Sequence, residues 1–221
     1  MRTKLLRLYN QLYRAYGPQQ WWPADSPFEV IIGAILVQST AWSNVTKAIH
    51  NLKTANLLTP ARLGNTSQTQ LEMLIRPSGY YRAKAQKIRS FLTHLRLQHD
   101  NRLDSLFQSE LLPLRDELLS IFGIGEETAD SILLYAAKKP ILVVDTYTHR
   151  LLTRLGWITG KYQYSGLQSM LMNSLPRHLD LFSEFHALIV RHGAQLCRKI
   201  PRCELCSLQA ECQVGLDNTG K

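Results

Sequence analysis

Residues 122–130 read FGIGEETAD and lie between two segments that have the apolar period of an α-helix. An apolar stripe runs over residues 114–122, and the helical pattern resumes over residues 128–137. Gly123 and Gly125 permit backbone conformations and close approaches that other residues do not. The stretch therefore predicts a hairpin between two helices whose backbone could grip one phosphate, although such a turn often does no more than join antiparallel helices.

The rest of the chain also shows helical periodicity and helix-capping signals. Apolar residues recur at helical spacing over residues 28–35, which carry almost no charge and predict a buried core helix. A capping box at Ser67 and Gln70 starts another helix, and a further helix is expected over residues 84–97. Only residues 141–144 look strand-like, and they are too short and isolated to build a sheet. The fold class expected is all-α.

Charge points to a polyanionic partner. The 221 residues include 26 Lys and Arg against 17 Asp and Glu, for a formal net charge of +9, which favours nucleic acid or an acidic membrane surface. Polar residues interrupt the longest uncharged stretch, residues 30–46, so no transmembrane helix is expected. Arg2, Lys4 and Arg7 leave no apolar signal region at the N-terminus, which is predicted to be an amphipathic helix of a cytoplasmic protein.

The four cysteines form one cluster, with five, two and five residues between them: Cys197, Cys203, Cys206 and Cys212. Disulfides are disfavoured in a reducing compartment, so four thiolates this close favour a metal centre. Structural zinc sites usually use two short pairs of ligands, whereas a single Cys-x-x-Cys with two longer arms suits a loop around a [4Fe-4S] cluster. The spacing favours the cluster and leaves zinc as the alternative.

Several motifs together resemble the helix-hairpin-helix DNA glycosylases of the endonuclease III superfamily, and the resemblance covers nearly the whole chain. They are Gly123-Ile124-Gly125-x-x-Thr128-Ala129, Val144-Asp145-Thr146 and the four-cysteine loop. Within the superfamily, Trp21-Trp22-Pro23 and Arg76-Pro77-Ser78-Gly79 look most like the branch that includes 3-methyladenine DNA glycosylase III.

The resemblance implies a fold, a function and a partner. The fold would be a six-helix domain over residues 27–139 and a second domain made of residues 1–26 and 140–221, with a damaged base bound in the cleft between them. The function would be base excision repair: a monomeric enzyme, cytoplasmic and nucleoid-associated, flips a damaged base out of double-stranded DNA and hydrolyses its N-glycosidic bond.

One departure from the family pattern bears on the reaction. In bifunctional endonuclease III, the second residue after the hairpin is a lysine that forms an imine with the sugar, and here that residue is Glu127. A carboxylate cannot form that imine, and Lys138 and Lys139 lie about three helical turns further on. The expected enzyme is monofunctional; the alternatives are a bifunctional glycosylase/AP lyase and a non-catalytic sensor of DNA structure.

The resemblance also assigns residues to the reaction and to the base. Asp145 would stabilise the positively charged sugar or activate water, although an aspartate at a helix start is more often only an N-cap. The base pocket would hold an alkylated purine against indole rings, and its expected residues are Trp21, Trp22, Pro23, Trp42 and Glu127. The tryptophans could instead be core anchors, and Glu127 an ordinary first-turn acid.

By the same comparison, Gln38 and Tyr80 would enter the duplex, unless they are plain surface or packing residues. The other residues expected to contact DNA are Arg82 and Lys84 on the segment after Tyr80 and Gly123, Ile124, Gly125 and Thr128 in the hairpin. A charged segment such as the one around Lys84 is usually a solvated helix face.

Overall fold

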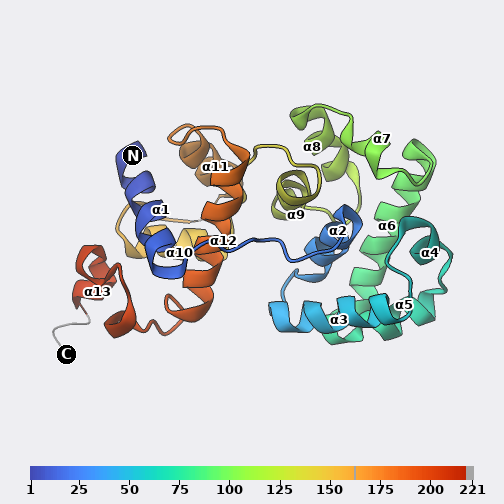
Figure 1. The fold of residues 1–221 in the computed structure, drawn as a ribbon, viewed down its shortest axis with the longest axis horizontal. Helices are drawn as coiled ribbons and strands as arrows, with labels where there is room; N and C mark the ends of the chain where they lie inside the picture. The colour runs from blue at the N-terminus through green and yellow to red at the C-terminus, as the bar shows by residue number, and fades with distance from the viewer. Residues whose placement is uncertain (162, 218–221) are drawn as a thin grey trace. The chain divides into compact units, whose positions relative to one another are not determined.

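The computed structural model describes residues 1–161 and 163–217, which form helices joined by loops, with no strand among them (Figure 1). The all-α prediction is confirmed. The chain separates into two compact units: Met1–Trp21 with Pro140–Lys221, and Trp22–Lys139. The family resemblance implies a first boundary between Ser26 and Pro27, and the compact units divide between Trp21 and Trp22. None of the described helices is long and apolar enough to cross a membrane.

The unit Trp22–Lys139 is built around one buried helix. This helix is α2 (Pro27–Leu36), in which every residue from Phe28 to Leu36 is buried. The Ser26 side chain caps it by accepting a hydrogen bond from the Glu29 amide at 3.2 Å. The remaining helices of the unit are α3 (Trp42–Thr54), α4 (Pro60–Asn65), α5 (Gln68–Ile75), η1 (Arg76–Ser78), α6 (Tyr81–His99), α7 (Leu103–Phe107), α8 (Leu111–Ser120), α9 (Glu126–Ser131) and the π-helical turn η2 (Ile132–Ala136).

The predicted helix-hairpin-helix is formed by α8, residues 121–125 and α9. A buried ion pair holds its two helices together: Arg115 Nε donates to Asp130 Oδ1 at 2.7 Å, and Asp130 is fully buried. Arg115 Nη2 also donates to Asp130 Oδ2 at 3.2 Å, so the pair is bidentate. Removing one partner would leave the other charge buried, so this contact fixes how α8 and α9 pack.

The other unit packs its longest helix, α12 (Leu179–Gln195), against α1 (Arg2–Tyr16) and α10 (Thr146–Arg154). The contact with α10 is close, because a Cβ on Gly193 would lie 2.3 Å from Tyr147 Cδ1. The unit also contains α11 (Tyr164–Met172), η3 (Cys203–Leu205), η4 (Gln209–Glu211) and α13 (Gln213–Asp217). Residues 141–144, which looked strand-like, are buried and belong to no regular element.

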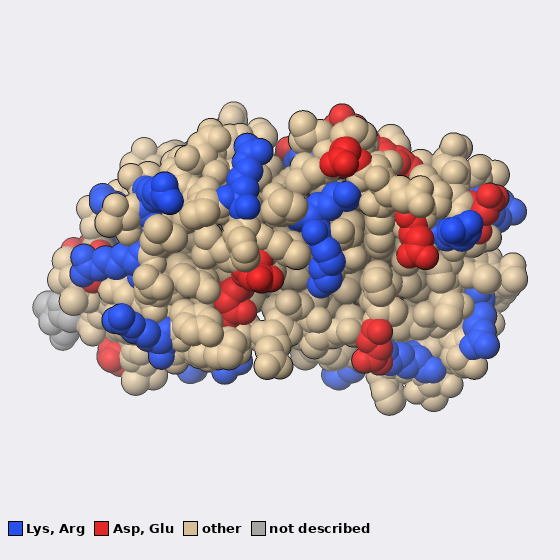
Figure 2. Space-filling view, turned by 45° about the horizontal axis from the view of Figure 1, so that its top comes forward, with Lys and Arg blue, Asp and Glu red and all other residues tan. Residues whose placement is uncertain are grey.

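The positive charge is dispersed on the face that Figure 2 displays. Lys and Arg side chains are spread over this face, and Asp and Glu side chains lie among them. The net charge of +9 is therefore not gathered into one basic patch there.

Candidate active site and metal centre

The hairpin depends on one glycine for its shape and leaves a second one uncovered. Gly123 has φ +86°, in the left-handed region, and a Cβ there would lie 2.2 Å from Lys87 Cγ. Gly125 has an extended backbone at φ −95° and nothing within 4 Å of its Cβ position. Ile124 is buried, 4% exposed, and anchors the turn. Gly123 is therefore needed by the fold itself, whereas Gly125 leaves its backbone open to a bound group.

Gln38, a predicted duplex-entering residue, is tied to this hairpin. Its Nε2 donates to the Gly123 carbonyl at 3.1 Å and to Thr128 Oγ1 at 3.0 Å. Its Oε1 accepts a hydrogen bond from the Lys87 ammonium. The side chain is half-buried, and its hydrogen bonds link the end of α2, the hairpin and α6. No local sequence pattern indicated Lys87 as the partner of Gln38.

Tyr80 has the geometry of a projecting side chain. It precedes α6 with φ +43°, a left-handed backbone that a tyrosine rarely adopts, and the residue is 75% exposed. Such strain persists only where the surrounding structure enforces it. Arg82 follows with a side chain that is 78% exposed, 3.8 Å from Glu72. Both residues can reach a ligand outside the protein.

Lys84 is buried in the free protein, which argues against its predicted contact with DNA phosphate. The residue is 2% exposed, and its ammonium donates to the carbonyls of Leu36 at 2.8 Å and Ser78 at 2.6 Å. Burial, with a contribution from the nearby Lys87 charge, lowers the pKa of Lys84 to about 8. Lys84 instead joins the end of α2, two residues before Gln38, to the turn before Tyr80.

Two of the three tryptophans predicted for the base pocket face each other. Trp22, Pro23 and Trp42 line a cavity of about 250 Å³, and the rings of Trp22 and Trp42 meet edge to face with centroids 5.1 Å apart. The Trp22 indole also rests on α2, because a Cβ on Gly33 would lie 3.2 Å from it. Trp22 is therefore both a packing residue and a cavity wall. Trp21 and Glu127 are not among the residues that line this cavity.

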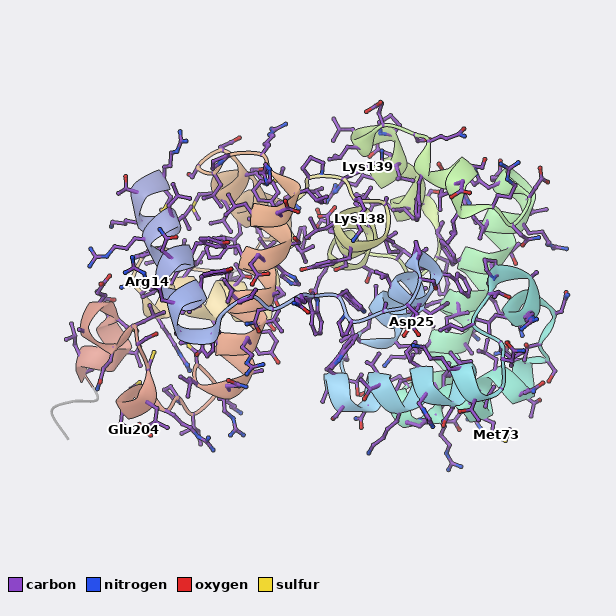
Figure 3. The ribbon with its side chains drawn as sticks, in the orientation of Figure 1. Arg14, Asp25, Met73, Lys138, Lys139 and Glu204 are labelled. Atoms are coloured by element: carbon purple, nitrogen blue, oxygen red, sulfur yellow. The ribbon has the colours of Figure 1, made fainter. Side chains whose placement is uncertain are left out.

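An ion pair lies in the wall of the same cavity. The ammonium of Lys53 is 2.7 Å from Glu29 Oε1 and 2.7 Å from Asp25 Oδ2; Figure 3 labels Asp25 beside α2. Desolvation lowers the pKa of Lys53, but its hydrogen bonds to the two carboxylates outweigh this and raise that pKa. The cavity thus combines indole faces with a fixed charge pair.

Asp145 is a buried carboxylate at the start of α10. It is 6% exposed, and its Oδ1 accepts hydrogen bonds from the Thr148 amide at 2.7 Å and the Thr148 hydroxyl at 2.8 Å. Its Oδ2 lies 3.9 Å from His186 Nε2, and burial lowers the pKa of His186, which is therefore neutral at pH 7. The predicted N-cap role is real, and it uses only one of the two carboxylate oxygens. His186 carried no signal in the sequence.

The four cysteines line one pocket in the unit that contains α10. Two arginines of α10 hold the loop: Arg150 donates to the Cys197 carbonyl at 2.7 Å, and Arg154 donates to Cys197 Sγ at 3.2 Å. Arg154 also donates to the carbonyls of Arg198 and Lys199. The cationic side chain on a cysteine sulfur suits a thiolate-bound metal, whose negative charge it offsets.

A buried histidine connects the cysteines to the N-terminal helix. His192 Nε2 lies 3.7 Å from Cys206 Sγ, and its Nδ1 lies 2.8 Å from the Tyr16 hydroxyl. Burial lowers the pKa of His192 to about 4 and raises that of Tyr16 to about 12, so both groups are neutral at pH 7 and share one hydrogen bond.

The hairpin has an uncovered glycine, and it is followed in the sequence by the buried Asp145 and by the cysteine-lined pocket. This combination is the one expected of a DNA-repair protein of the helix-hairpin-helix class. The family model "HhH-GPD superfamily base excision DNA repair protein" matches residues 32–177. The chain belongs to this superfamily, and it is a base-excision-repair DNA glycosylase of the endonuclease III type.

Individual relatives agree with this assignment. The chain is 41% identical over 209 residues to a DNA repair glycosylase of Methanocaldococcus jannaschii, covering 94% of this chain and 95% of the relative. It is 34% identical to endonuclease III of Thermotoga maritima over 85% of this chain and 83% of that one. Among solved structures, an endonuclease III–DNA complex matches with TM-score 0.84 at 24% identity over 100% and 99% of the two chains. H. pylori 3-methyladenine DNA glycosylase bound to 1,N6-ethenoadenine matches with TM-score 0.72 at 28% identity over 87% and 95%.

The two hairpin glycines are expected to respond differently to alanine. Gly125→Ala fits the space and backbone of the free protein, so the melting temperature of this variant should stay within about 2 °C of the wild type. Its affinity for duplex DNA should fall about tenfold, because the new methyl group blocks close approach of the backbone. Gly123→Ala should lower the melting temperature clearly, because it meets Lys87. Thermal melts and fluorescence anisotropy with labelled duplex check both. Unchanged DNA affinity in Gly125→Ala would show that this backbone does not approach DNA.

Proposed function

We propose that the enzyme is a monofunctional DNA glycosylase that flips alkylated purines out of duplex DNA and hydrolyses their N-glycosidic bonds as a monomer. The observation that carries the proposal is Glu127, the residue at the position of the imine-forming lysine of bifunctional endonuclease III. Glu127 is exposed in the first turn of α9. A carboxylate there cannot attack the sugar as an amine does, so water is the nucleophile.

The aromatic cavity supports an alkylated purine as substrate. Alkylation gives a purine positive charge and makes it a good leaving group, and an indole face attracts such a cation by about 0.5–2 kcal/mol. Trp22 and Trp42 offer these faces. The H. pylori relative, which was solved with an ethenoadenine base, is consistent with a modified adenine in this branch of the family. Glu127 and Trp21 stay proposed contacts to the base from outside the cavity wall.

Asp145 is the proposed catalytic carboxylate. As the bond between C1′ and the base nitrogen breaks, positive charge develops on the sugar, and a preorganised anion stabilises it. Asp145 Oδ2 is the oxygen that Thr148 does not occupy. The same oxygen can take the proton of the water that adds to C1′, and the leaving base takes the bonding electrons.

The proposed DNA contacts come from three places. Tyr80 wedges into the duplex, which its exposure and left-handed backbone support. Gln38 fills the space of the flipped base, and Arg82 meets phosphate. The hairpin residues Gly123, Ile124, Gly125 and Thr128 present backbone groups to a phosphate, with Thr128 held by Gln38.

We further propose that the four cysteines hold a [4Fe-4S] cluster. The four cysteines line one pocket, and their spacing, a single Cys-x-x-Cys with two longer arms, supports a cluster over the two short ligand pairs that are usual for structural zinc. When bound, the cluster supplies a cross-link that orders the loop. Arg150, Arg154 and His192 then fix this loop on α10 and α12.

A panel of duplexes that carry alkylated, deaminated and oxidised bases tests the proposed reaction. We expect base release from alkylated purines only, with strand cleavage only after alkali, and no protein–DNA adduct on treatment with borohydride. Trapping of an adduct would instead favour the bifunctional lyase that the endonuclease III relatives suggest. Tight binding of lesions without any base release would identify a non-catalytic sensor.

Asp145→Asn tests the catalytic carboxylate without uncapping α10. Asparagine caps helices as well as aspartate and keeps an oxygen for the two Thr148 hydrogen bonds, so the fold should be retained. Single-turnover base release should fall about 100-fold or more, while lesion affinity changes little. Full activity in this variant would remove Asp145 from the reaction.

Metal analysis of anaerobically purified protein tests the cluster. About four iron atoms per chain and a broad visible absorption are expected, and Cys203→Ala should lose most of the iron while Ser207→Ala, in the same loop, keeps it. A colourless protein with one zinc ion per chain would establish the zinc alternative instead.

A further inference from the structure

Two histidines and a glutamate converge in the unit Trp22–Lys139, outside every site described above. His94 and His99 lie on α6, and Glu117 lies on α8. Their ring nitrogens Nε2 are 2.7 Å and 2.6 Å from the same oxygen, Glu117 Oε1. One possible ligand atom from each of the three residues lies within 4.8 Å of the ligand atoms of the other two. Among the residues that the structure describes, this is the one group of three or more His, Cys, Asp or Glu side chains with such spacing.

The three side chains are partly buried, and a hydrogen bond holds one of the histidine rings in place. The side chains of His94, His99 and Glu117 are 21%, 12% and 23% exposed, so an ion could enter from solvent and still be held by protein on several sides. The rings of the two histidines have centroids 6.0 Å apart. On its far side, His99 Nδ1 lies 3.1 Å from the hydroxyl of Ser105 on α7. This contact fixes the His99 ring so that Nε2 faces the carboxylate.

The three donor atoms favour a particular class of metal ion. Two imidazole nitrogens and one carboxylate oxygen suit zinc and similar divalent transition ions, and three protein ligands leave a position for water. A metal-bound histidine usually donates its other N–H to a neighbouring oxygen, which sets its orientation. Ser105 Oγ is placed to accept that hydrogen bond from His99 Nδ1.

We propose that His94, His99 and Glu117 bind a divalent transition-metal ion, with zinc as the preferred ion, and that this ion ties α6 to α8. The ion would replace the Nε2 protons that now lie between the imidazoles and the carboxylate. Because α8 leads directly into the hairpin, the site would hold the first helix of the helix-hairpin-helix against α6, independently of the catalytic and cysteine sites. Its role is structural and does not depend on which base the enzyme removes.

Zinc titration of cluster-loaded protein, freed of loose ions by dialysis against EDTA, tests the proposal. By calorimetry, the wild type should bind one zinc equivalent, and His99→Gln should bind at least tenfold more weakly. Ser105→Ala, which leaves all three ligands in place, should lose about 10- to 100-fold in affinity. The matched control is His178→Gln: this histidine has a side chain that is 66% exposed and lies 4.0 Å from Asp180, and the substitution should leave affinity unchanged.

The first coordination shell separates this site from adventitious binding to cysteine. X-ray absorption of the zinc-loaded protein should give nitrogen and oxygen donors and no sulfur. Zinc should also raise the melting temperature of the wild type and of His178→Gln, but not that of His99→Gln. Equal zinc affinity in all four proteins, no binding in the wild type, or sulfur in the shell would overturn the proposal and leave a hydrogen-bonded His–Glu–His cluster.

Discussion

The buried carboxylate of Asp145 is the constraint on which the rest of the proposed active site depends. Moving a carboxylate out of water costs several kcal/mol unless hydrogen bonds and positive potential replace the lost hydration. At the start of α10, the Thr148 amide and hydroxyl supply the hydrogen bonds, and the helix N-terminus supplies the potential. Because these contacts all reach Oδ1, the same geometry that makes burial tolerable leaves Oδ2 for chemistry. Helix capping and the proposed reactivity are therefore assigned to different oxygens of one side chain.

The same helix connects the proposed catalytic group to the metal loop. Asp145 caps the first turn of α10, and Arg150 and Arg154 of its later turns hold the Cys197 segment. The cysteine loop contains only the short helices η3 and η4, so few regular hydrogen bonds order it without a metal. An ion or cluster bound there would order the end of α10 and thereby its packing on α12. A metal centre there would serve the proposed reaction by ordering the protein around α10.

The sequence predicted those features that local patterns encode. Local sequence patterns predict the hairpin glycines, the N-cap at Asp145 and the cysteine cluster. The burial of Lys84 was not predicted, because a lysine among other charged residues of a helix has the same pattern whether it faces solvent or donates to distant carbonyls. The partners Lys87, His186 and His192 were missed for a related reason: their contacts span from 14 residues of sequence (His192 to Cys206) to 176 (His192 to Tyr16), which periodicity does not report. Trp22 and Trp42 could be proposed as neighbours only through the family resemblance.

The hydrogen bonds of Gln38 bear on how such an enzyme could find a vacated position in DNA. In the free protein the Gln38 amide is satisfied by Gly123, Thr128 and Lys87. Its proposed insertion into the duplex would exchange these bonds, each worth about 0.5–1.5 kcal/mol net, for new ones. An intact base pair offers no unpaired edge to Gln38, whereas the base left opposite a flipped nucleotide offers a complete one. The proposed insertion would thus be favourable only where the duplex has already opened. Lys84 donates to the carbonyls of Leu36, near Gln38, and Ser78, near Tyr80, so it would hold both side chains in position to enter the same opened duplex.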